Sequence, residues 1–262
     1  MPGPAPQRRN RDAVAHNEEC VACHGDVAAE WQGSLHREAY TAREFQHALR
    51  NEPLPVCRGC HAPEADPRRP EPALAAIGVA CVTCHVPAGD EVLSAREQGA
   101  PLTAPHPVRR EAAFAGAGAC AGCHEFTFSD RRPVPEYMQT TIREHAVSSR
   151  RDRSCADCHM QRAADGHRTH GFAASRDAAW MRSVVTVSAV RPMADRVEVT
   201  LDLREDRVGH AFPTGDLLRR LAITVEVARA DREADARRQT ARRARRDAEA
   251  PGSPPADNPP AP

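Results

Sequence analysis

The 262-residue chain has few of the residues that usually build a protein core, and it has no lysine. Leu, Ile, Val and Phe together make up about 15 % of the sequence, and aromatic residues only 4 %. An aliphatic content this low usually indicates disorder, but disorder normally comes with a high net charge. Here 36 arginines balance 36 acidic residues. Neither a conventional aliphatic core nor simple disorder therefore fits most of the chain.

Other absences exclude whole classes of protein. The balanced charge argues against a strongly basic nucleic-acid-binding protein. The sequence has no apolar run long enough to span a membrane, and residues 1–16 contain no apolar core of a secretory signal peptide. Two residue types are unusually frequent instead, with 10 Cys and 13 His. These residues indicate what holds the chain together.

All ten cysteines fall into five C-x-x-C pairs, and a histidine directly follows every pair. Histidine makes up only about 5 % of the chain, so five matches do not arise by chance. The spacings between successive motifs are 37, 24, 39 and 35 residues. The five motifs are Cys20, Cys23 and His24; Cys57, Cys60 and His61; Cys81, Cys84 and His85; Cys120, Cys123 and His124; and Cys155, Cys158 and His159.

Covalent attachment of haem c explains every feature of these motifs. Two thiols three residues apart lie on one face of a helical turn and can form thioethers with the two haem vinyl groups. The histidine that follows then supplies the proximal iron ligand. A thioredoxin-like site needs one pair, not five; structural zinc and disulfides stay open as alternatives, although neither requires the histidine. The motifs therefore predict five haem c groups as cofactors, each with an iron.

With these five motifs the chain resembles the multihaem c-type cytochromes. It is most similar to the branch that includes the tetrahaem electron carrier of nitrification and the octahaem reductases of nitrogen and sulfur compounds. The resemblance spans roughly residues 17–229 and implies that His36 is an iron ligand. Three further stretches carry it, namely Trp31-x-x-Ser34-x-His36-x-x-Ala39, His167–Phe172 (HRTHGF) and His210–Gly215 (HAFPTG).

Eight histidines lie outside the motifs, and five of them would complete bis-His ligation of every haem. Methionine is the other common sixth ligand, and Met138, Met181 and Met193 stay open for this role without a supporting pattern. Met160 directly follows a proximal histidine and cannot reach the far face of that haem. Bis-His ligation is therefore predicted, and it implies lower potentials than His/Met ligation. The candidate distal ligands are His36, His106 between two prolines, His145 on a predicted helix, His170 in HRTHGF, and, for the fifth place, His47 or His210. His16 and His167 are expected to face solvent or to form hydrogen bonds.

The sequence predicts four segments of different character. Residues 17–182 are expected to form a mainly α-helical, loop-rich pentahaem domain wrapped around its cofactors. The alternating apolar runs in 183–229 predict a small antiparallel β domain of three strands, at 184–190, 197–203 and 221–227. Residues 1–16 are expected to be a flexible N-terminus, and the Arg- and Pro-rich tail 230–262 to be disordered. Helices are expected at 26–50, 72–78, 136–149 and 176–182.

These features predict an electron carrier that passes electrons through five haems between redox partner proteins. No catalytic residue and no nucleic-acid partner are expected, and the oligomeric state stays open. The alternative is a multihaem oxidoreductase with one open-site haem that acts on a small nitrogen or sulfur compound. The chain has no lysine to provide the lysine ligand of the pentahaem nitrite reductases. Haem c is normally attached outside the cytoplasm, so a periplasmic or other extracytoplasmic location is expected although no signal peptide is visible.

Overall fold

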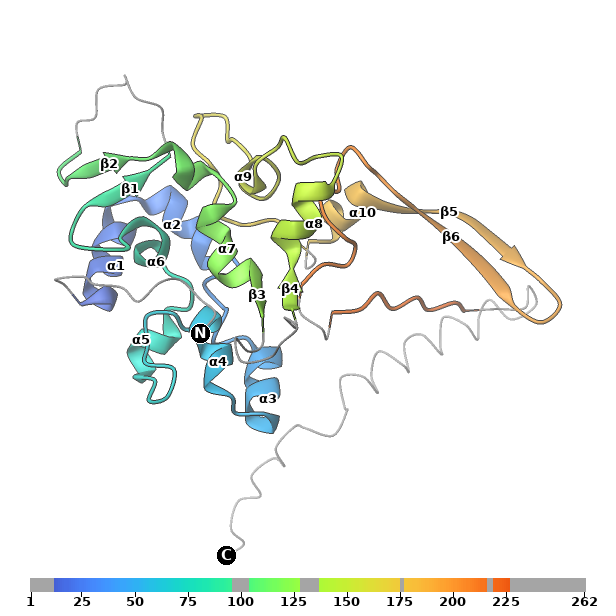
Figure 1. Ribbon diagram of the computed structural model, residues 1–262, viewed down its shortest axis with the longest axis horizontal. Coiled ribbons are helices and arrows are strands. Elements are labelled where there is room, and N and C mark those ends of the chain that lie inside the picture. Colours follow the sequence, from blue (N-terminus) through green and yellow to red (C-terminus); the bar gives the residue numbers. More distant parts are fainter. Residues whose placement is uncertain (1–11, 96–103, 128–136, 175–176, 216–218, 227–262) are drawn as a thin grey trace, which may run out of the picture. The chain divides into compact units, whose positions relative to one another are not determined.

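The computed structural model of the chain describes residues 12–95, 104–127, 137–174, 177–215 and 219–226. The chain divides into two compact units, Met1–Arg220 and Leu221–Pro262. The first unit consists of short helices, long loops and small two-stranded sheets (Figure 1). Most of the predicted flexible N-terminus and all of the predicted tail 230–262 lie outside the described residues.

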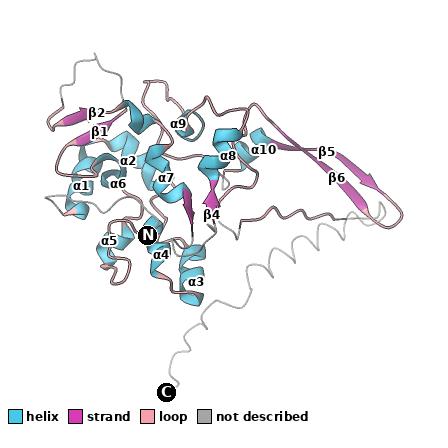
Figure 2. Cartoon of the chain, viewed as in Figure 1, coloured by secondary structure: helices cyan, strands magenta, loops and turns pink. Residues whose placement is uncertain are grey.

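Short helices dominate the first unit, as the sequence predicts (Figure 2). The expected helix at 26–50 is interrupted, because Gly33 ends its first part and turns follow to residue 41. The helices are α1 Ala13–Cys23, α2 Gly25–Gln32, α3 Arg43–Asn51, α4 Pro55–His61, α5 Pro72–Ala76, α6 Cys81–His85, α7 Gly118–His124, α8 Thr141–Val147, α9 Cys155–His159 and α10 Ala178–Val184, with a 3-10 helix η1 at Ala112–Ala115.

Three two-stranded sheets accompany these helices in the described part of the chain. β1 (Val92–Ser94) pairs in parallel with β2 (Val108–Arg110), and β3 (Glu125–Thr127) pairs antiparallel with β4 (Tyr137–Thr140). The antiparallel hairpin of β5 (Val185–Pro192) and β6 (Val197–Leu203) confirms two of the three predicted strands. The third strand is wrong for residues 221–226, which form no strand.

The β3–β4 sheet also corrects the predicted helix at 136–149. Residues 137–140 are extended, and the helix begins only at Thr141. Tyr137 pairs with Thr127 and Thr140 with Glu125 across the sheet. Tyrosine and threonine favour extended structure, so the local preference and the partner strand together outweigh the helical pattern here.

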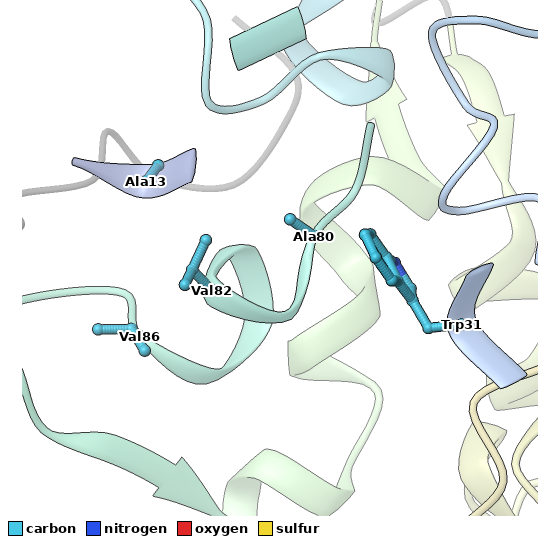
Figure 3. Close-up of a cluster of buried hydrophobic side chains, with 5 residues drawn as sticks. All are labelled: Ala13, Trp31, Ala80, Val82 and Val86. Atoms are coloured by element: carbon cyan, nitrogen blue, oxygen red, sulfur yellow. The ribbon is translucent and has the colours of Figure 1, made fainter. Parts of the chain in front are cut away.

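A small cluster of buried side chains holds the N-terminal helices together. Figure 3 shows Ala13 of α1, Trp31 of α2, and Ala80, Val82 and Val86 from the segment that contains α6. The indole N–H of Trp31 donates a hydrogen bond to the Val79 carbonyl at 2.8 Å, which satisfies its polar atom inside the cluster. Half of the twelve buried hydrophobic residues in the described part are alanines, so the protein core consists of small side chains. No helix in the described ranges is both long and apolar enough to cross a membrane.

Candidate haem sites

Each of the five Cys-x-x-Cys-His motifs forms a helical turn that ends at or directly before its histidine. The motifs close helices α1, α4, α6, α7 and α9. In the first motif His24 donates its N–H to the Cys20 carbonyl at 2.9 Å. In the other four motifs the residue after the histidine donates its N–H to the carbonyl four residues back, as Ala62 does to Arg58 at 2.9 Å and Met160 to Ala156 at 3.0 Å. Its own backbone then leaves the helix, with φ of −142° at Ala62 and −131° at Met160. The two cysteines of each motif thus lie one turn apart on the same side of a helix.

Local sequence fixes where two of these turns begin. Pro55 lies in the first turn of α4, where its missing N–H costs no hydrogen bond. At α9 the Ser154 hydroxyl accepts a hydrogen bond from the Asp157 N–H at 3.1 Å, and the Asp157 carboxylate accepts one from the Ser154 N–H at 3.0 Å. This capping box explains how a helix of only five residues forms in front of His159.

Three of the motif histidines are oriented by the same kind of hydrogen bond. Nδ1 of His61 donates to the Ala39 carbonyl at 2.6 Å, and Nδ1 of His85 donates to the Leu93 carbonyl at 2.8 Å. Nδ1 of His159 likewise donates to a backbone carbonyl at 2.8 Å. A proton held on Nδ1 leaves the lone pair on Nε2, which is the arrangement of histidines that bind metals.

Four motif histidines lie opposite four of the predicted distal histidines. An imidazole nitrogen binds a transition metal at about 2 Å, so two rings on opposite sides of one iron have centroids roughly 6 Å apart. The four observed separations fall in the narrow range from 6.1 to 6.4 Å. The pairs are His24 with His106 at 6.4 Å, His124 with His36 at 6.3 Å, His85 with His170 at 6.2 Å, and His159 with His210 at 6.1 Å.

The remaining candidates have other surroundings. The ring of His61, the histidine of the second motif, stacks on Phe45 with centroids 3.9 Å apart and an angle of 11° between the planes. His47 is exposed, and its Nε2 lies 3.2 Å from the Asn51 amide on the same helix. Both ring nitrogens of His145 point at backbone carbonyls, as described below. His16 is buried in α1 and does not face solvent.

Burial keeps several of the paired imidazoles neutral. It lowers the pKa of His36 to about 4, with a further contribution from the neighbouring His124. Burial likewise lowers the pKa of four other paired histidines, which are His85, His124, His159 and His170. A metal ligand must be a neutral imidazole, so these groups are ready to bind iron at neutral pH.

Contacts made by the Trp31-x-x-Ser34-x-His36 motif stabilise the backbone around His36. The Ser34 hydroxyl accepts a hydrogen bond from the Arg37 N–H at 3.2 Å, and the His36 carbonyl accepts one from the Val79 N–H at 2.9 Å. Gly78 has φ of +63°, and a Cβ at that position would lie 2.5 Å from the His36 carbonyl oxygen. This close backbone approach, together with the indole bond of Trp31 to the same segment, explains why the motif surrounds this histidine.

Glu30 holds the HRTHGF stretch in place, although it belongs to none of the sequence motifs. Its carboxylate accepts hydrogen bonds from the His170 N–H at 2.8 Å and from Nε2 of His167 at 3.1 Å. Nδ1 of His167 lies 2.6 Å from the Asp165 carboxylate. Glu30 is separated from His170 by 140 residues, so only its position directly before Trp31 could have drawn attention to it.

The attachment turns of different motifs adjoin one another. The thiol of Cys60 lies next to that of Cys123, and the thiol of Cys120 lies next to that of Cys155. Burial raises the pKa of Cys81 to about 11, and the nearby Cys20 adds to the effect. The first motif therefore adjoins the third, and the fourth adjoins both the second and the fifth.

The arrangement fits haem better than the alternatives. All ten cysteines are free thiols, so no i, i+3 disulfide forms. Among the described residues, no group of three or more His, Cys, Asp or Glu side chains could hold a bare metal ion. Paired thiols one helical turn apart, neutral imidazoles and opposed ring pairs with room for one iron are instead the donor set that a haem c requires.

Comparison with known proteins agrees with this donor set. Residues 19–86, which contain the first three motifs, match the family "Cytochrome c554 and c-prime". The chain is also similar to the crystal structure of a penta-heme cytochrome c552 from Thermochromatium tepidum, with a TM-score of 0.55 and 20 % identity over 77 % of this chain and 68 % of that one. At this identity the likeness shows a shared fold. No curated protein matches the chain.

Proposed function

Because the chain is a multihaem c-type cytochrome, we propose that it carries electrons between redox partner proteins through five covalently bound haems. The observation that carries this proposal is the set of four opposed histidine pairs at 6.1 to 6.4 Å. Each haem, when bound, supplies a one-electron iron couple. The protein contributes the thiols that attach the cofactors, the imidazoles that ligate them and the backbone that orients those imidazoles.

In this proposal the ten motif cysteines form the thioethers and the five motif histidines are the proximal ligands. His106, His170, His36 and His210 are the distal ligands opposite His24, His85, His124 and His159, respectively. A haem with an imidazole on both faces needs no substrate at its iron, which suits a carrier. The hydrogen bonds from Nδ1 to backbone carbonyls make the imidazoles of His61, His85 and His159 stronger electron donors to an iron. Stronger donation to the iron favours a low reduction potential.

The second motif differs from the other four because Phe45 stacks directly on its histidine, His61. The sixth ligand of this site decides between a pure carrier and the alternative function, an oxidoreductase with one open haem. His47 and His145 are the sequence-predicted distal candidates that are not paired with another motif histidine. We also propose an extracytoplasmic location, because haem c is normally attached there.

The test is a haem count and a spectrum of the purified holoprotein. The pyridine haemochrome assay should give five haems per chain, and a reductive titration should take up five electrons. The spectrum should be that of low-spin haem and should not change with CO or nitrite. A count other than five would overturn the pentahaem proposal, and one high-spin haem that binds CO or nitrite would favour the oxidoreductase.

Four substitutions test the ligand pairs individually. His106→Ala, His170→Ala, His36→Ala and His210→Ala should each convert one haem to the high-spin form while the count stays at five. Met193→Ala is the control for methionine ligation, and it should leave the spectrum unchanged because this exposed side chain lies beyond β5. Any of the four histidine variants with an unchanged low-spin spectrum would remove that pair from the proposal.

A further inference from the structure

Helix α8 contacts the HAFPTG stretch on both sides of His210. Nδ1 of His145 donates a hydrogen bond to the carbonyl of Gly209 at 2.7 Å, directly before His210. The Glu144 carboxylate accepts one from the N–H of Ala211 at 3.1 Å, directly after it. Two consecutive residues of one helix therefore hold the two backbone neighbours of a single histidine.

His145 also contacts the segment that leads into the opposite side of the same site. Its Nε2 lies 2.8 Å from the Arg153 carbonyl oxygen, two residues before Cys155 of the fifth motif. The fifth motif contains His159, whose ring is parallel to that of His210 within 6° at a centroid separation of 6.1 Å. His145 thus ties the backbone that carries one ring to the backbone that carries the other.

Close packing and further hydrogen bonds make this arrangement specific. A Cβ on Gly209 would lie 3.2 Å from Nδ1 of His145, so glycine is what permits the approach. The Glu144 carboxylate also accepts hydrogen bonds from the hydroxyls of Thr140 and Thr214, both at 2.7 Å. The Thr214 hydroxyl lies 2.8 Å from that of Thr141 on the same helix, so the stretch is held at its far end as well.

We propose that Glu144 and His145 are positioning residues that hold His210 opposite His159, and that His145 is not itself an iron ligand. An iron ligated by an imidazole nitrogen lies about 2 Å from that nitrogen, on the side that its lone pair faces. A carbonyl oxygen already lies on that side of both nitrogens of His145, at 2.7 Å from Nδ1 and 2.8 Å from Nε2, so neither nitrogen has room for an iron. This inference rests on the proposed function, because it assigns roles around one of the proposed haem sites.

The His145→Ala variant tests the inference with the haem-loaded protein. Loss of the contacts with the Gly209 and Arg153 carbonyls should let His210 move away from its position opposite His159. A fraction of one haem per chain should then become high-spin, and the midpoint potential of that haem should shift. His210→Ala should convert one whole haem. The double variant should also convert one haem and no more, because both substitutions act on the same iron.

Conservative variants separate positioning from a loss of folding. The asparagine amide nitrogen is as many bonds from Cβ as Nδ1 of histidine is, so His145→Asn can keep the bond to Gly209 and should restore most of the low-spin signal. Glu144→Gln keeps an acceptor and should have a smaller effect than Glu144→Ala. Val147→Ala changes an exposed side chain of the same helix and should leave the spectrum unchanged.

Two results would overturn the inference. If the double variant converts two haems, His145 and His210 ligate different irons. If His145→Ala leaves both the spectrum and the potentials unchanged, the residue does not position His210. The haem count of each variant must stay at five for these comparisons. A wild-type protein without five haems contradicts the proposed function instead, so the two failures are distinguishable.

Discussion

The motif-bearing region, Ala13–Val184, and the β5–β6 hairpin differ in how far their apolar side chains are buried. The hairpin is rich in valine and leucine, yet Val187 is 60 % exposed, Val190 56 % and Leu203 42 %. All twelve buried hydrophobic residues of the described chain lie at or before Val184, in the region that is poorer in aliphatic residues. Aliphatic content therefore does not locate the core of this protein.

The difference follows from what each region has to pack against. A two-stranded hairpin has no second layer, so its apolar side chains stay accessible to solvent. The motif-bearing region instead surrounds half-buried imidazoles with small side chains and backbone carbonyls. Under the proposed function, five porphyrins provide the apolar area that its own side chains lack.

Haem removal should have the largest effect on this comparison. A chain produced without haem insertion should lose most of its helical circular dichroism, much as small metal domains unfold without their metal. Hydrogen exchange in helices α1 to α9 should become fast. A compact apoprotein with slow exchange in these helices would contradict the idea that haem replaces the aliphatic core.

Trp31→Ala should cost about 3–5 kcal/mol of unfolding free energy, because it empties the centre of the buried cluster and removes the indole hydrogen bond. Val187→Ala on the hairpin is the control and should cost about 0.5 kcal/mol or less. Denaturant unfolding followed by circular dichroism measures the unfolding free energy of both variants, and it does not depend on the fluorescence of Trp31. Equal costs would mean that the hairpin carries as much of the stability as the cluster does.

Gly78→Ala and Gly89→Ala form a matched pair. Both glycines have φ near +60°, but only at Gly78 would a Cβ meet backbone atoms, at 2.5 Å. The Gly78 variant should therefore lose about 1–3 kcal/mol more unfolding free energy than the Gly89 variant. It should also perturb the spectrum of the haem for which His36 is the proposed ligand. Similar losses of unfolding free energy in both variants would show that the backbone around His36 can shift to accept a Cβ at position 78.

The smallest effect concerns pH and His167. Hydrogen bonds to Asp165 and Glu30 raise the pKa of His167. A raised folded-state pKa contributes stability that is complete below the unfolded value of about 6.5 and is lost as pH rises through the folded value. His167→Gln should make the unfolding free energy less dependent on pH in that window. Asp165→Asn should reduce the same pH dependence, because it removes one of the two carboxylates beside His167. An identical profile in wild type and His167→Gln would rule out this contribution.

Local pattern was sufficient to predict the helical turns of the motifs, and it singled out histidines that the structure brings close to them. The five motifs form helical turns because the i, i+3 spacing and the caps act within a few residues. Four of the six candidate distal histidines, His36, His106, His170 and His210, lie opposite motif histidines. The helix predicted at 136–149 failed in its first turn, because strand β3, about ten residues earlier in the chain, pairs with residues 137–140.

The sequence alone predicted a multihaem c-type cytochrome, because the thioether attachment motif consists of residues three and four positions apart. Only the tertiary structure decided which histidines face each other, since partners such as His85 and His170 come from distant segments held by Glu30 and other remote contacts. It also separated His145 from the paired histidines, because both of its ring nitrogens lie against backbone carbonyls that no local pattern places beside it.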